Sequence, residues 1–247
     1  MIRLTLPKRP DFLTDEFVKE KTEKFMLNPK ARVWDIPELK EILLRGSYGK
    51  CAFSETRLNE EGKYMTIEHF YPKSLYPEKV LEWGNMLPCL NVCNSNKKEA
   101  DPTVKPLVNP YFDDPKDYFY VKDGRIRALD SENVKSVNTI ESYDLNNFRQ
   151  LREPRLKIID KITQTLKDIR ILFNKAEDFE EGLRRLEKLM IKSGRIGAYS
   201  ATKSTVILEN EDYMEMRKIL KEKDLWFAPW HYLEEELRFC ALPHPAP

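Results

Sequence analysis

The sequence lacks any long hydrophobic run and contains few cysteines. No apolar stretch approaches the roughly 18 residues of a membrane span, and the first residues, Met1–Leu6, lack the apolar core of a signal peptide. We therefore expect a cytoplasmic protein with no membrane segment. The four cysteines, at positions 51, 89, 93 and 240, are too few and too unevenly spaced for a disulfide scaffold in a chain of 247 residues.

The sequence also lacks a strong net charge. The formal charge of +1 gives no overall basic character, but the charges are unevenly distributed along the chain. Residues 145–205 carry 14 Lys and Arg against 8 Asp and Glu, whereas residues 206–247 carry 5 against 9. One face could therefore meet phosphate and another a protein partner. Solvated helix faces on which charges happen to cluster would give the same distribution, so both explanations stay open.

The most informative segment lies between residues 66 and 97. An acid stands directly before a histidine, Glu68-His69, at the end of a β-type run, and Asn94 follows 25 positions later in a segment of helical character. Such an arrangement can place a base and metal ligands around one phosphate. The pattern resembles the HNH nuclease motif of the ββα-metal fold, with Asn85 as its middle element and Lys97 completing the trailing Cys-Asn-x-x-Lys.

The resemblance to HNH nucleases implies a role for each residue. His69 would be the general base, since an imidazole titrates near neutral pH, and Glu68 and Asn94 would present oxygen ligands to Mg²⁺ or Mn²⁺. Adjacent strand residues point to opposite faces, so the Glu-His pair can share a site only if the strand ends there. Asn85 would be structural, bonding backbone across a loop, and Lys97 would either contact phosphate or be solvated.

The flanking residues narrow the resemblance. Gly49–Phe53, Pro106–Tyr111 and Asp123-Gly124 are similar to segments of the PtuB family, and the likeness spans roughly residues 40–225. In that family an HNH effector works with an ATPase in Septu and some retron antiphage systems. The resemblance implies a nucleic acid substrate, DNA or RNA, and a P-loop ATPase partner of the PtuA type.

The chain has no G-x-x-x-x-G-K-[ST] nucleotide-binding motif of its own. We therefore expect control of the nuclease to come from the ATPase. The acidic, aromatic stretch from Val206 to Pro247 is the first candidate surface for this partner, with Trp226 and Trp230 as buried anchors. A degenerate HNH module that binds nucleic acid or the ATPase without cleaving remains the alternative.

Three cysteines raise the question of a zinc site. Many HNH proteins of this type resemble zinc ribbons, with two Cys-x-x-Cys pairs around the ion. Here Ser54 replaces the second cysteine of the pair that Cys51 begins, and the other pair, Cys89 and Cys93, is one residue longer. Cys89 and Cys93, four residues apart, would share one face of a helix and could still bind one ion. The hydroxyl of Ser54, however, is a poor zinc ligand. We therefore expect no bound zinc and three small buried thiols.

These patterns predict an α+β protein with a small ββα-metal core, an accessory β-hairpin and a C-terminal helical region. The predicted segments are a helical cover at 1–45, the HNH core at 46–100, a connector and hairpin at 101–145, and the helical region at 146–247.

Local patterns predict the elements within these segments. A strand is expected at Met65–Glu68 and a helix from about Pro88 to Lys98. Asp123-Gly124 between two β-type runs predicts a hairpin. From residue 148 onward, apolar residues recur in three- and four-residue steps, which predicts helices; the first would leave basic side chains such as Arg155 exposed.

Overall fold

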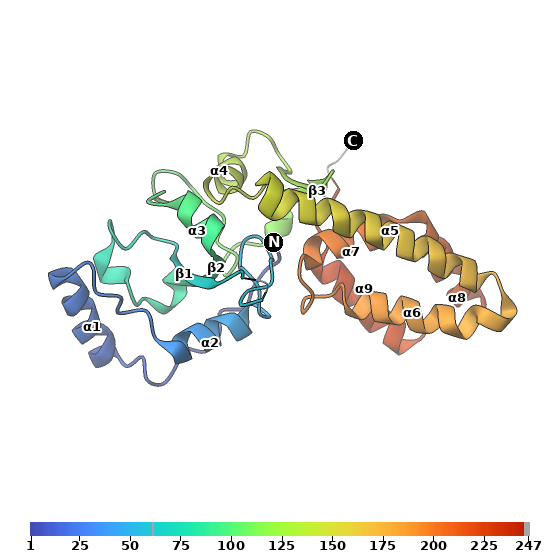
Figure 1. Ribbon diagram of the computed structural model, residues 1–247, viewed down its shortest axis with the longest axis horizontal. Helices are drawn as coiled ribbons and strands as arrows, with labels where there is room; N and C mark the ends of the chain where they lie inside the picture. Colours follow the sequence, from blue (N-terminus) through green and yellow to red (C-terminus); the bar gives the residue numbers. More distant parts are fainter. Residues whose placement is uncertain (61, 245–247) are drawn as a thin grey trace. The chain divides into compact units, whose positions relative to one another are not determined.

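The computed structural model describes residues 1–60 and 62–244 (Figure 1). The chain divides into two compact units. The first contains Met1, Arg3–Tyr118 and Ala128–Leu145, and the second contains Ile2, Phe119–Arg127 and Asn146–Pro247. Helices and two small antiparallel hairpins place the chain in the α+β class, as predicted.

Two helices open the first unit. α1 (Asp15–Leu27) begins where the Thr14 hydroxyl accepts a hydrogen bond from a first-turn amide. α2 (Pro37–Gly46) carries its proline in the first turn, where the missing N–H costs nothing, as predicted. Apolar side chains of both helices form one buried cluster with side chains of the first hairpin, among them Phe25, Leu39, Leu43, Ile67 and Met86.

The first hairpin and the helix after it make a ββα unit. β1 (Met65–His69) pairs antiparallel with β2 (Met86–Leu90), and α3 (Asn91–Lys97) follows without a loop. The predicted helix from about Pro88 is therefore wrong at its start, because Pro88 to Leu90 belong to a strand. All five β2 residues are buried, so this strand lacks the alternation of apolar and polar residues by which a half-buried strand is recognised.

The rest of the first unit is mostly irregular. A tight turn lies between Lys50 and Arg57, and short 3₁₀ helices lie at Pro77–Lys79, Trp83–Asn85 and Pro115–Asp117. α4 (Val134–Ser142) was not expected from the sequence. It begins at Asn133, whose side chain accepts a hydrogen bond from the Ser136 amide.

The second hairpin belongs to the second unit. β3 (Phe119–Lys122) and β4 (Arg125–Ala128) are joined by Asp123 and Gly124, whose φ angles are 52° and 67°. Positive φ at both central residues is the requirement of a type I′ hairpin turn. The hairpin predicted from the Asp-Gly pair is therefore confirmed.

Helices form most of the described remainder of the second unit (Figure 1). A turn of π-helix (Phe148–Arg152) leads into α5. The helices and one 3₁₀ turn that follow are α5 (Glu153–Phe173), Ala176–Asp178, α6 (Phe179–Ile191), α7 (Ser200–Glu209), α8 (Glu211–Glu222) and α9 (Ala228–Cys240).

Two side chains of this helical unit differ from their predicted placement. The spacing of apolar residues predicted that Arg155 is exposed. Its exposed fraction is only 2%, so this prediction is wrong. Trp230 is buried in the core of the unit together with residues of α5, α6, α7 and α8, so it is not available to a partner as the anchor that the sequence suggested. Trp226 is partly buried at the edge of the same cluster.

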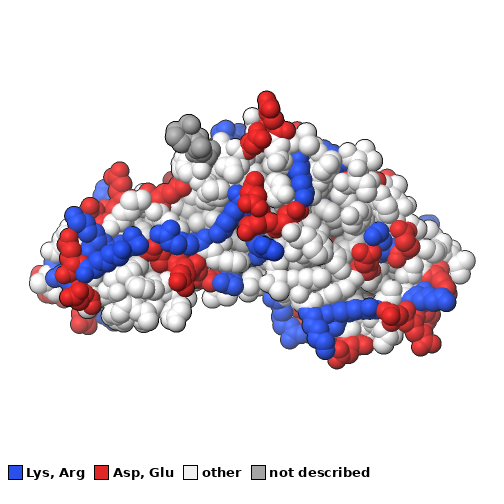
Figure 2. All heavy atoms as spheres, turned by 180° about the vertical axis from the view of Figure 1, so that it is seen from behind, with Lys and Arg blue, Asp and Glu red and all other residues white. Residues whose placement is uncertain are grey.

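Surface charges of both signs are interspersed. Figure 2 shows Lys and Arg next to Asp and Glu over the face that it displays, with no single basic field. Several basic side chains between residues 145 and 205 are paired within their own helices, as in Lys157–Glu153 and Arg185–Glu181. In the described ranges, no helix combines the length and the apolar character that crossing a membrane requires.

Candidate active site

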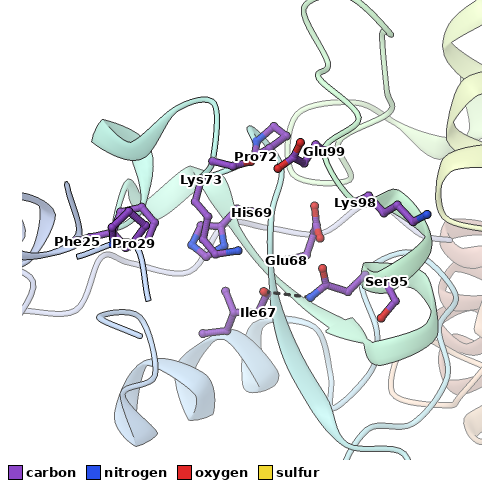
Figure 3. A pocket seen from close by; sticks show the side chains of 12 residues that line it. Phe25, Pro29, Ile67, Glu68, His69, Pro72, Lys73, Ser95, Lys98 and Glu99 are labelled. Atoms are coloured by element: carbon purple, nitrogen blue, oxygen red, sulfur yellow. Dashed lines mark hydrogen bonds between the residues drawn. The ribbon is translucent and has the colours of Figure 1, made fainter. Parts of the chain in front are cut away.

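A cavity of about 490 Å³ opens beside the ββα unit (Figure 3). Glu68 and His69 from β1 line it together with Asn94 from α3, and Lys73 and Lys98 contribute positive charge. In the view of Figure 3, Glu68 lies between His69 on one side and Ser95 of α3 and Lys98, which follows α3, on the other. We call this space the His69 cavity. The structure thus brings together the three side chains that the sequence singled out for chemistry.

Glu68 and His69 share this cavity because β1 ends at His69. Asn85 holds the chain immediately beyond. Its Oδ1 accepts a hydrogen bond from the Tyr71 amide at 2.7 Å, and its Nδ2 donates to the carbonyl oxygens of Tyr71 at 3.1 Å and Lys79 at 2.9 Å. With an exposed fraction of 1%, Asn85 fixes the turn after β1 and does not line the cavity.

His69 is held in one orientation. Its Nε2 lies 2.9 Å from the Val80 carbonyl oxygen, and its ring packs nearly perpendicular to that of Trp34 with centroids 5.1 Å apart. Because a carbonyl oxygen can only accept a hydrogen bond, the Nε2 atom of His69 carries the proton and Nδ1 keeps its lone pair.

Burial and, to a smaller extent, the charge of Lys73 lower the pKa of His69 to about 3. The imidazole is therefore neutral at pH 7 and does not titrate near neutral pH, contrary to the expectation from its ordinary value.

Glu68 forms a buried ion pair with Lys97. The Lys97 Nζ lies 2.6 Å from Glu68 Oε1 and also donates to the carbonyl oxygens of His69 and Phe70 at 2.6 and 2.8 Å. Both side chains are 2% exposed, so neither expected position of Lys97, on phosphate or in solvent, is correct. Burial raises the pKa of Glu68 to about 7 although the Lys97 charge opposes the shift. The contact occupies Oε1, so Oε2 is the oxygen that a ligand could use.

Asn94 is oriented by β1. Its Nδ2 donates to Thr66 Oγ1 at 2.9 Å and to the Ile67 carbonyl oxygen at 3.3 Å. Because the amide nitrogen is fixed in this way, Oδ1 is the atom that Asn94 can offer to a cation. The helical spacing of α3 therefore places Asn94 toward the cavity and Lys97, three residues later, beneath it.

Two cavity lysines were not identified from the sequence. Lys73 is partly buried, and its Nζ lies 4.9 Å from the centroid of the Trp34 ring, a cation–π contact that holds the ammonium beside His69. Lys98 is exposed and follows α3 with a φ of 51°. The only sequence sign of Lys73 is its place just after Pro72, which is too weak to distinguish it from other surface lysines.

Comparison with known proteins gives the family. No family model matches the chain. It is 32% identical over 237 residues to a Septu protein PtuB of Bacillus thuringiensis, an alignment that covers 92% of this chain and 89% of the relative. The chain belongs to the PtuB family. A Septu protein PtuB of Bacillus mycoides strain KBAB4 is 30% identical over 164 residues, covering 54% of each chain. Membership in the PtuB family implies a role in antiphage defence.

In this PtuB-family chain three cysteines lie together, Cys89 from β2, Cys93 from α3 and Cys51 from the turn before β1. The Sγ atoms of Cys51 and Cys89 are 3.9 Å apart, and Cys93 is in hydrogen-bonding contact with both. Ser54 completes the group, but its hydroxyl bonds to Thr56 Oγ1 at 3.1 Å. Within the described ranges, no set of three or more His, Cys, Asp and Glu is placed to hold a metal ion. The donor set thus offers three thiols and a weak fourth ligand.

We expect the purified PtuB-family protein to contain well under one zinc per chain. A site in which serine replaces one thiolate lacks much of the coordination energy that makes structural zinc tight. Elemental analysis of protein purified without chelator would measure this content. Zinc at one per chain that disappears in both Cys51→Ser and Cys93→Ser, but not in Cys240→Ser, would contradict the expectation.

Proposed function

We propose that the chain is a metal-dependent HNH endonuclease that hydrolyses phosphodiester bonds of nucleic acid. The observation that carries the proposal is the convergence of Glu68, His69 and Asn94 on one cavity at the junction of β1, β2 and α3. A base, an acid and an amide oxygen around a space with two lysines match the needs of phosphodiester hydrolysis. DNA and RNA present the same phosphodiester to this cavity.

His69 would act as the general base. Its tautomer leaves the Nδ1 lone pair free to take a proton from the attacking water, while the bond from Nε2 to Val80 keeps the ring in place. A pKa of about 3 makes the imidazole a weak base. The negative charge of a bound phosphodiester would raise the pKa, since an opposite charge favours the imidazolium.

Glu68 and Asn94 would hold the metal ion. Their free oxygens, Oε2 and Oδ1, are hard ligands of the type that Mg²⁺ and Mn²⁺ prefer, and a site with two protein ligands leaves positions for water and phosphate. When bound, the ion supplies stabilisation of negative charge on the departing oxygen. Lys97 keeps the Glu68 carboxylate in position through Oε1.

Lys73 and Lys98 would contact phosphate. Both line the His69 cavity, and neither has an ion-pair partner among the pairs formed by the described residues. Two cations at the rim would attract the polyanion and orient its backbone. This assignment replaces the phosphate contact first considered for Lys97.

A degenerate module that binds without cleaving is the second candidate. Two observations favour it. Lys97 already pairs with the Glu68 carboxylate, which weakens the attraction of that carboxylate for a cation. Loss of one thiolate from the cysteine group points the same way. Retention of a base, an acid and an amide in one cavity favours the nuclease.

The metal assignment predicts a higher Mg²⁺ requirement when either ligand is removed. In Glu68→Ala and Asn94→Ala, the Mg²⁺ concentration for half-maximal cleavage should rise at least about tenfold, since loss of one ligand costs metal affinity. Titration of cleavage with Mg²⁺ would measure it. Ser95→Ala is the matched control because Ser95 also lines the cavity. Unchanged titrations in both ligand variants would move the metal elsewhere.

We further propose that a P-loop ATPase of the PtuA type docks on the C-terminal helices. A hollow of about 570 Å³ lies there, lined by side chains of α8, α9 and the segment between them. Arg217 lies 5.3 Å from the Trp226 ring centroid, Glu234 pairs with both Arg217 and Arg238, and Lys221 adds positive charge. A half-buried tryptophan beside charged side chains is a common anchor for a protein partner. Of the two predicted anchors, only Trp226 can serve, and the last three residues of the Val206–Pro247 segment lie outside those described.

Trp226→Ala is therefore expected to weaken binding of the ATPase by about 2 kcal/mol, or roughly 30-fold. Titration of the full-length chain with the ATPase would measure it, with Tyr232→Ala as control because Tyr232 is 70% exposed on α9 outside the hollow. A truncation near Leu208 is unsuitable because α8 and α9 supply core residues. Equal affinity for Trp226→Ala, Lys221→Glu and the unmodified chain would disprove this docking site.

A further inference from the structure

A second hollow of about 340 Å³ lies in the first unit and is lined mainly by aromatic and apolar side chains. Phe70 and Tyr71 form part of its wall, and Phe112, which is 64% exposed, forms another part with Pro106 and Leu107. We call it the aromatic hollow. Nothing in the proposed chemistry of the His69 cavity uses it.

The aromatic hollow and the His69 cavity share one turn of the chain. Phe70 and Tyr71 directly follow His69 and line the hollow, whereas the next two residues, Pro72 and Lys73, line the His69 cavity. The turn is held rigidly, because Phe70 donates its amide to the Asn85 carbonyl oxygen at 2.9 Å in addition to the side-chain bonds of Asn85. The two spaces are therefore neighbours with a fixed spacing.

The charges of the aromatic hollow are paired. Asp113 contacts Lys135 at 2.7 Å, and Glu82 contacts Lys79 at 3.0 Å. A space whose charged groups neutralise one another does not favour a phosphate, but its apolar rings favour a flat, uncharged group. Phe112 lies close over Gly84, where a Cβ atom would meet its Cζ at 3.3 Å, so the glycine leaves room for the ring.

We propose that the aromatic hollow binds an unstacked nucleobase of the strand whose phosphate occupies the His69 cavity. The inference rests on the proposed nuclease function and specifies its substrate class. A base that enters the hollow has left its stack and its base pair, which costs least in a single strand. Stacking on protein aromatic rings accepts any base. The substrate is therefore single-stranded DNA or RNA, and the Phe112 ring contributes to its binding.

Binding of a labelled single-stranded oligonucleotide to full-length chains carrying His69→Ala tests the proposal without cleavage. Adding Phe112→Ala should weaken the affinity by about 5- to 150-fold, the equivalent of 1 to 3 kcal/mol for one stacked base. Tyr64→Ala is the matched control, because Tyr64 is a 75% exposed aromatic residue of the same unit outside the hollow, and it should bind as tightly as the parent. Equal affinity for the Phe112 and Tyr64 variants would overturn the proposal.

A cleavage map separates this proposal from the nuclease assignment. Oligonucleotides with one abasic position are incubated with the chain that has intact His69, alone and with its ATPase partner, in single-stranded form and in duplexes with their complement. The bond whose cleavage would require the missing base in the hollow lies at a fixed offset from the abasic position, and this bond should not be cut. In Phe112→Ala the base no longer matters, so this bond should be cut at the same rate as the others. A uniform map, or equal rates on single strand and duplex, would overturn the base site while leaving the nuclease intact. No cleavage of either form contradicts the nuclease, and the binding comparison still decides on the base site.

Discussion

Replacing His69 with alanine is expected to lower the rate of phosphodiester cleavage by about 10²- to 10⁴-fold, the usual contribution of a general base. The Nδ1 lone pair that would accept the proton is lost, whereas Glu68, Asn94 and Lys73 remain. Single-turnover cleavage of a labelled oligonucleotide in saturating Mg²⁺ would measure the rate directly. A rate within threefold of the unmodified chain would refute the assignment.

The burial of His69 calls for a second variant. Alanine leaves the Val80 carbonyl without its donor and opens space beside Trp34, so the protein should also lose some stability. His69→Gln retains a donor of similar size but no imidazole base. We expect both variants to lose cleavage equally, and His69→Gln to have a melting temperature closer to that of the unmodified chain. This result would show that cleavage is lost with the proton acceptor and not with the packing. His244→Ala is the control, since His244 is exposed and lies outside the cavity.

Lys97→Met is expected to destabilise the first unit by about 3 to 5 kcal/mol. The substitution leaves the Glu68 carboxyl buried without its partner, so that it must stay charged or take up a proton, and two carbonyl oxygens lose their donor. Denaturant unfolding would measure the change in free energy. Lys98→Met is a matched control at the next position, where exposure predicts a change within about 0.5 kcal/mol.

A double substitution tests whether the cost comes from the unpaired charge. When Glu68→Gln accompanies Lys97→Met, no buried charge is left over, so much of the lost stability should return although cleavage should not. If Lys97→Met unfolds with the same free energy as the unmodified chain, the Glu68–Lys97 pair is not a structural support of the site.

Elements with strong local patterns could be predicted from the sequence. Pro37 marks the start of α2, and Asp123-Gly124 defines the second hairpin, because each signal depends on backbone geometry within a few residues. β2 was not predicted, because burial on both sides removes its alternation. The predicted exposure of Arg155 is wrong because its burial depends on contacts between elements. The spacing of apolar residues along one helix does not reveal such contacts.

The same limit applies to the site. The spacing of Glu68, His69 and Asn94 identified the residues that meet in the cavity, since a motif fixes which positions face one another. The sequence could not show that Lys97 is buried beneath Glu68 or that Lys73 occupies the cavity over Trp34. Those positions follow from how α3 and the turn after β1 pack, and both change the electrostatics of the site.

The most direct measurement of the central claim is cleavage by the purified full-length chain, alone and with its ATPase partner. Supercoiled plasmid, single-stranded oligonucleotides and total tRNA would be incubated in Mg²⁺ or EDTA, in parallel with His69→Ala. The expected result is cleavage of a nucleic acid that requires Mg²⁺ and intact His69. Absence of cleavage of all three substrates under every condition, or cleavage that persists unchanged in His69→Ala, would contradict the nuclease assignment.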